Sequence, residues 1–192
     1  MAGVFQYTVV LDACVLYPAP VRDVLMNLAV RGAFHARWTA RIHDEWTRNL
    51  LARRMDVDAA KLALTVELMN GAIEDAVIEN YEYLITTLDL PDPDDRHVLA
   101  AAIVGHADAI VTYNLKDFPA EVVGLHDIEV LHPDDFLVFQ YDLNNIAFVK
   151  TIKEIREGLK NPPLAAAELI ETYKGNSLHR TADLLTKAIE LI

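Results

Sequence analysis

Four acidic residues, far apart in the sequence, are the side chains best suited to chemistry: Asp12, Glu45, Asp95 and Asp117. Each is expected at the end of a strand or helix, or beside the apolar face of a helix. The carboxyl ends of parallel strands line the binding crevice of an open α/β sheet, so these carboxylates can converge there. Clustered carboxylates repel one another unless a cation neutralises them. A donor set made only of oxygens favours the hard cations Mg²⁺ or Mn²⁺.

Such a site activates water and stabilises charge during displacement at phosphorus. Several of the acids also have a purely structural interpretation. Asp95 and its neighbour Asp94 could complement a helix dipole, Glu45 could lie on a solvated helix face, and Asp117 could be a turn residue. Asp12 is the exception, because an acid that follows a buried apolar run is costly unless it is paired.

The elements that must position these acids follow from apolar patterning. A β-branched and aromatic run over residues 7–11 predicts a buried strand that ends at Asp12. Residues 109–112 predict a second strand, whose end delivers Thr112, Asn114 and, after a turn, Asp117. Residues 128–131 predict a last strand. Helices are predicted over residues 20–30, from Thr39 to about Arg54, from Asp58 to about residue 70, and from Pro93 to Ala107, whereas residues 81–88 are β-prone but short.

The character of the chain changes after His132, where only helical patterns follow. They predict helices from about Asp134 to Tyr141 and over residues 143–159, 164–173 and 177–191. We therefore expect two parts, a domain over residues 1–132 and an all-helical C-terminal extension over residues 133–192. The extension is interpreted as a packed addition or as a surface that binds a partner.

Composition limits the class of protein. A hydrophobic content of 53% predicts an ordered core, and the apolar runs are too short for a membrane span or a signal peptide. The single cysteine, Cys14, excludes an internal disulfide framework and fits a reducing compartment, so a cytoplasmic location is expected. The net charge of −12 argues against a protein that coats nucleic acid non-specifically.

Positive charge is nevertheless concentrated in one stretch. Between Arg31 and Arg54 the chain carries six arginines, opposed only by Asp44 and Glu45. One interpretation is the solvated face of a helix; the other is a local basic rim that contacts RNA. On the second interpretation, the candidates for RNA contacts are Arg41, Arg48 and Lys116.

The chain resembles the PIN-domain nucleases, and especially the VapC-like toxins of type II toxin/antitoxin modules. The segments that carry the resemblance are VLDACVLYP, HDEWTRNL, PDPDDRHVLAAAI and AIVTYNLKDFP, which lie between Val9 and Leu131. The tail, with its KNPPL segment, is similar to the helical C-terminal extension of one bacterial branch of these proteins. The family often has a hydroxyl or amide residue just after the first acid, where this chain has Ala13 and Cys14.

The resemblance implies an α/β PIN-like fold, with a central, mainly parallel sheet flanked by helices, and a Mg²⁺-dependent (or Mn²⁺-dependent) ribonuclease. Asp12 and Asp117 would hold the metal most directly, and Glu45 and Asp95 would complete the site or orient water. Thr112 and Asn114 would position the acids by hydrogen bonds. The partners expected are an RNA substrate and a cognate antitoxin protein, with no membrane, and a homodimer stays open.

Three other interpretations stay open. One is a PIN-family RNA-processing nuclease outside a toxin module. Another is a haloacid-dehalogenase-like phosphatase, although that class usually carries a second Asp two residues after the nucleophile, where this chain has Cys14. The third is a PIN-like binding module without catalysis, against which the presence of all four acids argues.

Overall fold

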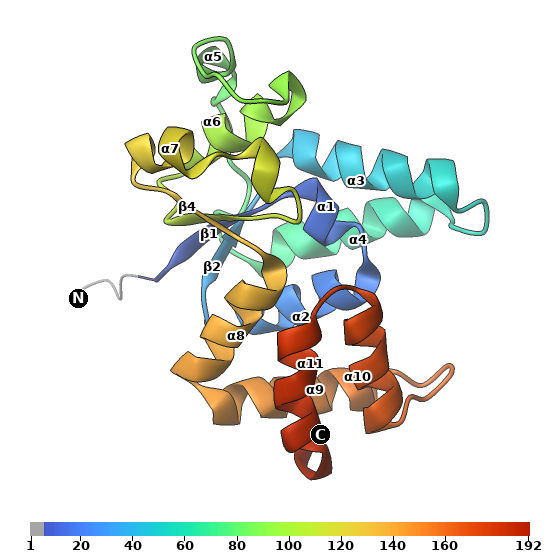
Figure 1. The fold of residues 1–192 in the computed structure, drawn as a ribbon. Coiled ribbons are helices and arrows are strands. Elements are labelled where there is room, and N and C mark those ends of the chain that lie inside the picture. The colour runs from blue at the N-terminus through green and yellow to red at the C-terminus, as the bar shows by residue number, and fades with distance from the viewer. Residues whose placement is uncertain (1–5) are drawn as a thin grey trace.

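The fold is that of a parallel sheet flanked by helices, as predicted. The computed structural model describes residues 6–192 (Figure 1). Within these residues a four-stranded sheet has the order β2-β1-β3-β4, with every neighbouring pair parallel. The strands are β1 Thr8–Leu11, β2 His35–Arg37, β3 Ala109–Val111 and β4 Glu129–Leu131.

The two central strands end side by side. Side chains of both are almost wholly buried, which explains their continuous apolar sequences. The register pairs Leu11 with Val111, and the next residue, Asp12, donates its backbone N–H to the carbonyl oxygen of Val111 at 3.1 Å. Asp12 and Thr112 therefore leave the sheet as neighbours, although they are 100 residues apart in sequence.

Helices surround this sheet in the first part of the chain. Two of the helices begin with a side-chain cap: Thr39 accepts a hydrogen bond from the backbone N–H of Ile42, and Asp58 accepts one from the backbone N–H of Ala60. The buried alanine-rich helix α6 contacts β1 and β3. The helices are α1 Ala13–Leu16, α2 Ala19–Val30, α3 Ala40–Arg53, α4 Ala59–Ala72, α5 Glu82–Ile85, α6 Arg96–Val104 and α7 Ala120–Val123.

Two features were not predicted. The edge strand β2 lies between α2 and α3, where the sequence pattern indicated no strand; its pairing of His35 with Thr8 extends the sheet beyond β1. The β-prone residues 81–88 contain the short helix α5 instead of a strand. In both places, contacts with distant residues decide the local structure more than intrinsic propensity does.

The C-terminal extension is helical, as predicted, and packs against the first part of the chain. Its helices are α8 Pro133–Leu143, α9 Asn145–Gly158, α10 Ala166–Gly175 and α11 His179–Lys187. Both α9 and α10 contact α2, on the side opposite α5 in Figure 1. The last helix is clamped to α8, because the buried Asp134 carboxylate accepts hydrogen bonds from the backbone N–H and the hydroxyl of Thr181, at 2.8 and 2.7 Å.

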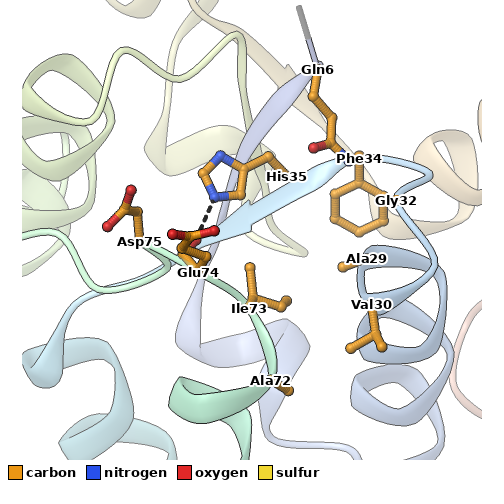
Figure 2. Close-up of a pocket in the computed structure, with 10 residues that line it drawn as sticks. All are labelled: Gln6, Ala29, Val30, Gly32, Phe34, His35, Ala72, Ile73, Glu74 and Asp75. Carbon is orange, nitrogen blue, oxygen red and sulfur yellow. Dashed lines mark hydrogen bonds between the residues drawn. The ribbon is translucent and has the colours of Figure 1, made fainter. Parts of the chain in front are cut away.

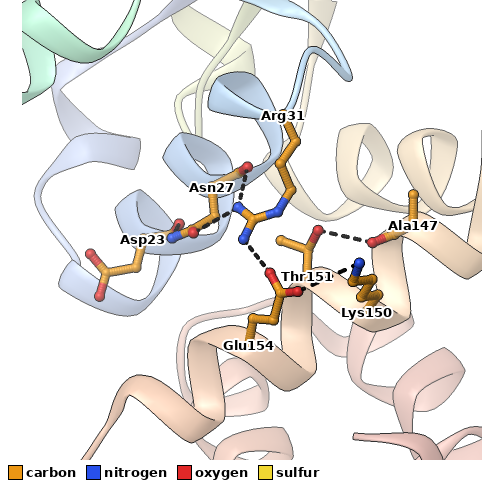
Figure 3. Close-up of polar contacts among 7 residues, drawn as sticks. All are labelled: Asp23, Asn27, Arg31, Ala147, Lys150, Thr151 and Glu154. Atoms are coloured by element: carbon orange, nitrogen blue, oxygen red, sulfur yellow. Dashed lines mark hydrogen bonds and ion pairs between the residues drawn. The ribbon is translucent and has the colours of Figure 1, made fainter.

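A polar seam joins α2 to α9 (Figure 3). The Arg31 guanidinium donates to the carbonyl and side-chain oxygens of Asn27, at 2.9 Å each, and to the Glu154 carboxylate of α9. Lys150 Nζ lies 3.9 Å from the other Glu154 oxygen. These side chains are partly exposed, so the ion pairs add little stability, and the docking rests mainly on a shared apolar core. The division at residue 132 stays a prediction.

No helix within residues 6–192 has the length and apolar character needed to cross a membrane.

Candidate active site

Asp12 is the most buried of the predicted acids, with 3% of its surface exposed. Its Oδ1 accepts a hydrogen bond from the backbone N–H of Ala13 at 2.6 Å, and its Oδ2 accepts one from the Thr112 hydroxyl at 2.7 Å. Burial raises the pKa of Asp12, the hydrogen bonds partly offset that effect, and the charge of Glu45 adds to it. Asp12 is therefore a buried, hydrogen-bonded carboxyl group, and no positive charge within residues 6–192 lowers its pKa.

Cys14 belongs to the same cluster, and the sequence reasoning did not assign it a role. Its Sγ lies 3.1 Å from Asp12 Oδ2 and 3.2 Å from the Thr112 hydroxyl oxygen, and it accepts the backbone N–H of Tyr113 at 3.2 Å. Burial, followed by the charge of Asp12, raises the pKa of Cys14, so the group is a neutral thiol that can donate to Asp12. The thiol supplies a polar group close to the first acid.

The loop after β3 is fixed at both of its ends. The buried Thr112 hydroxyl donates to Asp12 and accepts the backbone N–H of Asn114 at 3.0 Å. The carbonyl oxygen of Asn114 then accepts the backbone N–H of Asp117 at 3.0 Å, within the 3₁₀ turn Leu115–Asp117. Thr112 thus contacts an acid through its side chain, whereas Asn114 holds the loop through its backbone.

Tyr113 ties this loop to the C-terminal extension. Its hydroxyl donates a hydrogen bond to the carbonyl oxygen of Asn176, just after α10, at 2.8 Å. Its ring also packs edge-on against His132, with 5.1 Å between ring centroids. Tyr113 is therefore held in place by contacts with residues outside the sheet.

Asp95 and Asp94 occupy different environments. Asp95 is half-buried and Asp94 is exposed. Asp95 occupies the position before α6, yet its side chain makes no capping hydrogen bond within residues 6–192, so the carboxylate faces other groups. Burial raises the pKa of Asp95 to about 7, and the negative charges of Asp12, Asp92, Asp117 and Glu45 contribute in that order. The fold thus brings all four predicted acids within electrostatic range of one another.

Glu45, on α3, acts electrostatically on Asp95 and also contacts a histidine of α6. Its Oε2 lies 3.5 Å from Nε2 of His97, a residue of α6 that is only 1% exposed. The other ring nitrogen of His97 has no hydrogen-bond partner among the described residues. His97 was not singled out from the sequence; its position two residues after Asp95, in an otherwise apolar helix, was the available signal.

These residues fit a hard cation by chemistry, although they do not form a finished coordination sphere. Within residues 6–192, no three His, Cys, Asp or Glu side chains are arranged closely enough to hold a metal ion as they stand. The converging donors are nevertheless all carboxylates, and the pKa of Asp95 is raised first by burial and then by the negative charges of the neighbouring acids. A divalent cation with oxygen ligands would relieve that repulsion.

The predicted basic contacts lie outside the cleft beside the acids. Arg41, Arg48 and Lys116 are all exposed, the first two on α3 and the third in the turn before Asp117. The cleft itself, of about 410 Å³, has Arg53 on its wall instead. Its other lining side chains include Tyr17, Glu45, Asn49 and Asn114.

Another cavity, of about 380 Å³, lies at the opposite end of the sheet (Figure 2). It is lined by His35, whose Nε2 lies 3.0 Å from the carbonyl oxygen of Glu74. His35 pairs with Thr8 at the start of β1, whereas Asp12 follows the end of β1. None of the predicted site residues lines this cavity, so the candidate site is the one at the carboxyl ends of the strands.

The fold and this set of acids define a PIN domain. Residues 8–116 match the family model described as PIN domain, and the chain belongs to that family. Residues 133–187 match a second model, the VapC50 C-terminal domain, which confirms the resemblance to VapC-like proteins with a C-terminal extension.

One relative extends this comparison. The protein named "Putative ribonuclease VapC50" from Mycobacterium tuberculosis is 43% identical over 77 residues, which are 40% of this chain and 46% of the relative. The match thus spans somewhat less than half of the relative's length. No solved structure matches the chain.

The raised pKa of Asp95 predicts how the stability of the metal-free protein depends on pH. Unfolded Asp95 loses its proton near its ordinary value of 3.8, whereas the folded residue loses it near 7. The folded state therefore binds more protons in this interval, and the free energy of unfolding should fall as the pH rises from about 4 to about 8. The raised pKa of Asp12 acts in the same direction.

Urea denaturation in the presence of EDTA, at about pH 5 and about pH 8, measures this effect. We expect Asp95→Asn to have a flatter pH dependence than the wild type, because the variant lacks the group that titrates. Equal slopes for the two proteins would contradict the predicted environment of Asp95.

Proposed function

We propose that this protein is a metal-dependent ribonuclease that hydrolyses phosphodiester bonds of RNA, and that it is the toxin of a toxin/antitoxin pair in the cytoplasm. The observation that carries the proposal is the convergence of four carboxylates at the ends of β1 and β3 in a PIN domain, with the pKa of Asp95 raised to about 7. The relative named as a ribonuclease supports the choice of RNA as substrate.

The roles proposed for the residues are those that the family resemblance implies. Asp12 and Asp117 would hold Mg²⁺ or Mn²⁺ most directly, while Glu45 and Asp95 would complete the site or orient the attacking water. When bound, the cation activates that water and stabilises the charge that develops on the phosphoryl oxygens. The hydroxyl of Thr112 keeps the Asp12 carboxylate in one orientation through its 2.7 Å hydrogen bond.

An acidic protein needs local positive charge to bind RNA. The chain carries a net charge of −12, but the Debye length is about 8 Å at physiological salt, so distant acids are largely screened. Arg41, Arg48 and Lys116 are exposed on elements that carry Glu45 and Asp117, and we assign them contacts with RNA phosphates. Such contacts position the backbone without reading its sequence.

The toxin role rests on the C-terminal part of the chain. Residues 133–187 match the VapC50 C-terminal domain, and VapC-like proteins are the toxins that the motifs of this chain resemble. A cognate antitoxin is therefore the proposed protein partner. The test is whether the neighbouring reading frame encodes a small DNA-binding protein and whether that protein co-purifies with this chain. Both results would support the toxin role over a role in RNA maturation.

The proposed activity is tested by removing the metal. The purified protein should cleave a labelled single-stranded RNA in Mg²⁺ or Mn²⁺, lose that activity in EDTA, and regain it when excess Mg²⁺ is added. In parallel, p-nitrophenyl phosphate should not be hydrolysed. Cleavage that persists in EDTA would overturn the metal dependence, and hydrolysis of the phosphomonoester alone would favour the phosphatase interpretation.

A further inference from the structure

A cleft of about 410 Å³ borders the candidate site, with Glu45 and Cys14 among its lining residues. Helix α1, which begins directly after Asp12, packs against α3, which carries Glu45, and the loop residue Asn114 closes a third side. Trp46 also lines the cleft and is fully buried, so its indole forms part of a rigid floor. Cavities of this size hold small molecules or single groups of a larger ligand.

Four polar side chains line this cleft without a hydrogen-bond or ion-pair partner among residues 6–192. They are Tyr17, Asn49, Arg53 and Asn114. Arg54, the neighbour of Arg53, does have a partner, because its guanidinium lies 2.7 Å from the Asp56 carboxylate. The cleft therefore offers an aromatic ring, two amides and a free guanidinium to a ligand.

The helical register connects this set to the candidate active site. Glu45, Asn49 and Arg53 are spaced by four residues on α3 and share one face of the helix. Tyr17 directly follows α1, and its ring packs partly against the core. A ligand in the cleft would contact all of these side chains while its other end lay beside Glu45.

We propose that this cleft binds one unstacked nucleotide of single-stranded RNA, next to the phosphate that is cleaved. The assignment rests on the proposed ribonuclease function and names the form of its substrate. The Tyr17 ring stacks on the base, and the amides of Asn49 and Asn114 bond to its edge or to the 2′-hydroxyl. Arg53 contacts a phosphate, where its positive charge offsets the nearby carboxylates. A base held in a duplex cannot enter such a cleft without unpairing.

Binding measured without divalent cations tests the cleft separately from catalysis. The probe is a fluorescein-labelled single-stranded RNA of about ten nucleotides, compared in EDTA with the same RNA annealed to its complement. The full chain should bind the single strand more tightly. Tyr17→Ala should weaken that binding about tenfold, whereas Tyr17→Phe, which keeps the ring, should retain most of it.

Arg53→Ala supplies a second variant at an exposed position, with Arg54→Ala as its matched control. Arg53→Ala should weaken binding several-fold and make its dependence on salt shallower, because one phosphate contact is lost. Arg54→Ala should bind like the wild type. Equal effects at the two arginines, or an unchanged affinity of Tyr17→Ala, would overturn the subsite.

The two proposals fail in different ways. If the wild type cleaves RNA in Mg²⁺ while Tyr17→Ala and Arg53→Ala keep its affinity and its kcat/KM, the nucleotide subsite is wrong and the ribonuclease function stands. If RNA binding depends on Tyr17 and Arg53 but no RNA is cleaved in any divalent cation, the cleft is an RNA site and the ribonuclease function is wrong.

Discussion

Asp12→Asn is expected to lower the rate of RNA cleavage on the order of a thousandfold, which corresponds to about 4 kcal/mol of lost transition-state stabilisation. The substitution removes the buried negative charge that is proposed to hold the cation, but the asparagine side chain keeps the size and shape of the aspartate. An asparagine oxygen can still accept the N–H of Ala13, so the cap of α1 should survive. Because burial raises the pKa of Asp12, the metal-free variant should be at least as stable as the wild type.

Asp58→Asn is the matched control for this substitution. Asp58 also caps a helix through its carboxylate, by accepting the N–H of Ala60, but it lies at the start of α4 and outside the group of acids. Its replacement should leave the cleavage rate close to that of the wild type. Calorimetric titration with Mn²⁺ provides a second measurement, and an unchanged affinity in Asp12→Asn would remove Asp12 from the ligand set.

The second large effect should separate two adjacent acids. Asp95→Asn is expected to reduce cleavage by at least about a hundredfold, whereas Asp94→Asn should retain most of the activity. The reason is that Asp95 is half-buried and its pKa responds to Asp12, Asp117 and Glu45, whereas Asp94 is exposed. Both substitutions replace one carboxyl group of the same turn by an amide of the same shape, so each controls for the other.

Cleavage rates of the two variants, together with their melting temperatures, decide this comparison. Loss of activity in Asp94→Asn with activity spared in Asp95→Asn would mean that the orientation of this turn is wrong. Loss in both, with intact folding, would mean that the charge of the turn as a whole matters more than one carboxylate.

The sequence was sufficient to predict the parts of the site that depend on periodicity. The apolar run before Asp12 and the one before Thr112 correctly predict two buried strands, and parallel pairing places their ends together. In these strands local pattern and tertiary contacts favour the same arrangement. The pattern of α6 does not by itself separate Asp95 from Asp94, because residues 97–102 are all buried and lie three and seven positions after either acid; the exposure of the two acids in the fold separates them.

Other parts of the fold and of the candidate site depend on tertiary contacts that the periodicity of the sequence does not predict. Strand β2 is only three residues long and includes His35 and Arg37, so only its pairing with β1 defines it. The role of Cys14 follows from a hydrogen bond to Asp12 that no spacing rule predicts. The sequence places several arginines on α3, but which of them faces the cleft depends on how α3 packs against α1, and the one on its wall is Arg53.

The hydrogen bond from the Tyr113 hydroxyl to the carbonyl oxygen of Asn176 has a consequence for the modularity of the protein. The residue that separates Thr112 from Asn114 is anchored to the turn after α10, so the geometry of the active-site loop is set partly by the last helices of the chain. A domain boundary at residue 132 would separate Tyr113 and Asn176 in the sequence, although the hydrogen bond between them joins the two parts in the structure. The smallest fragment that keeps the loop in its native position therefore extends at least through Asn176.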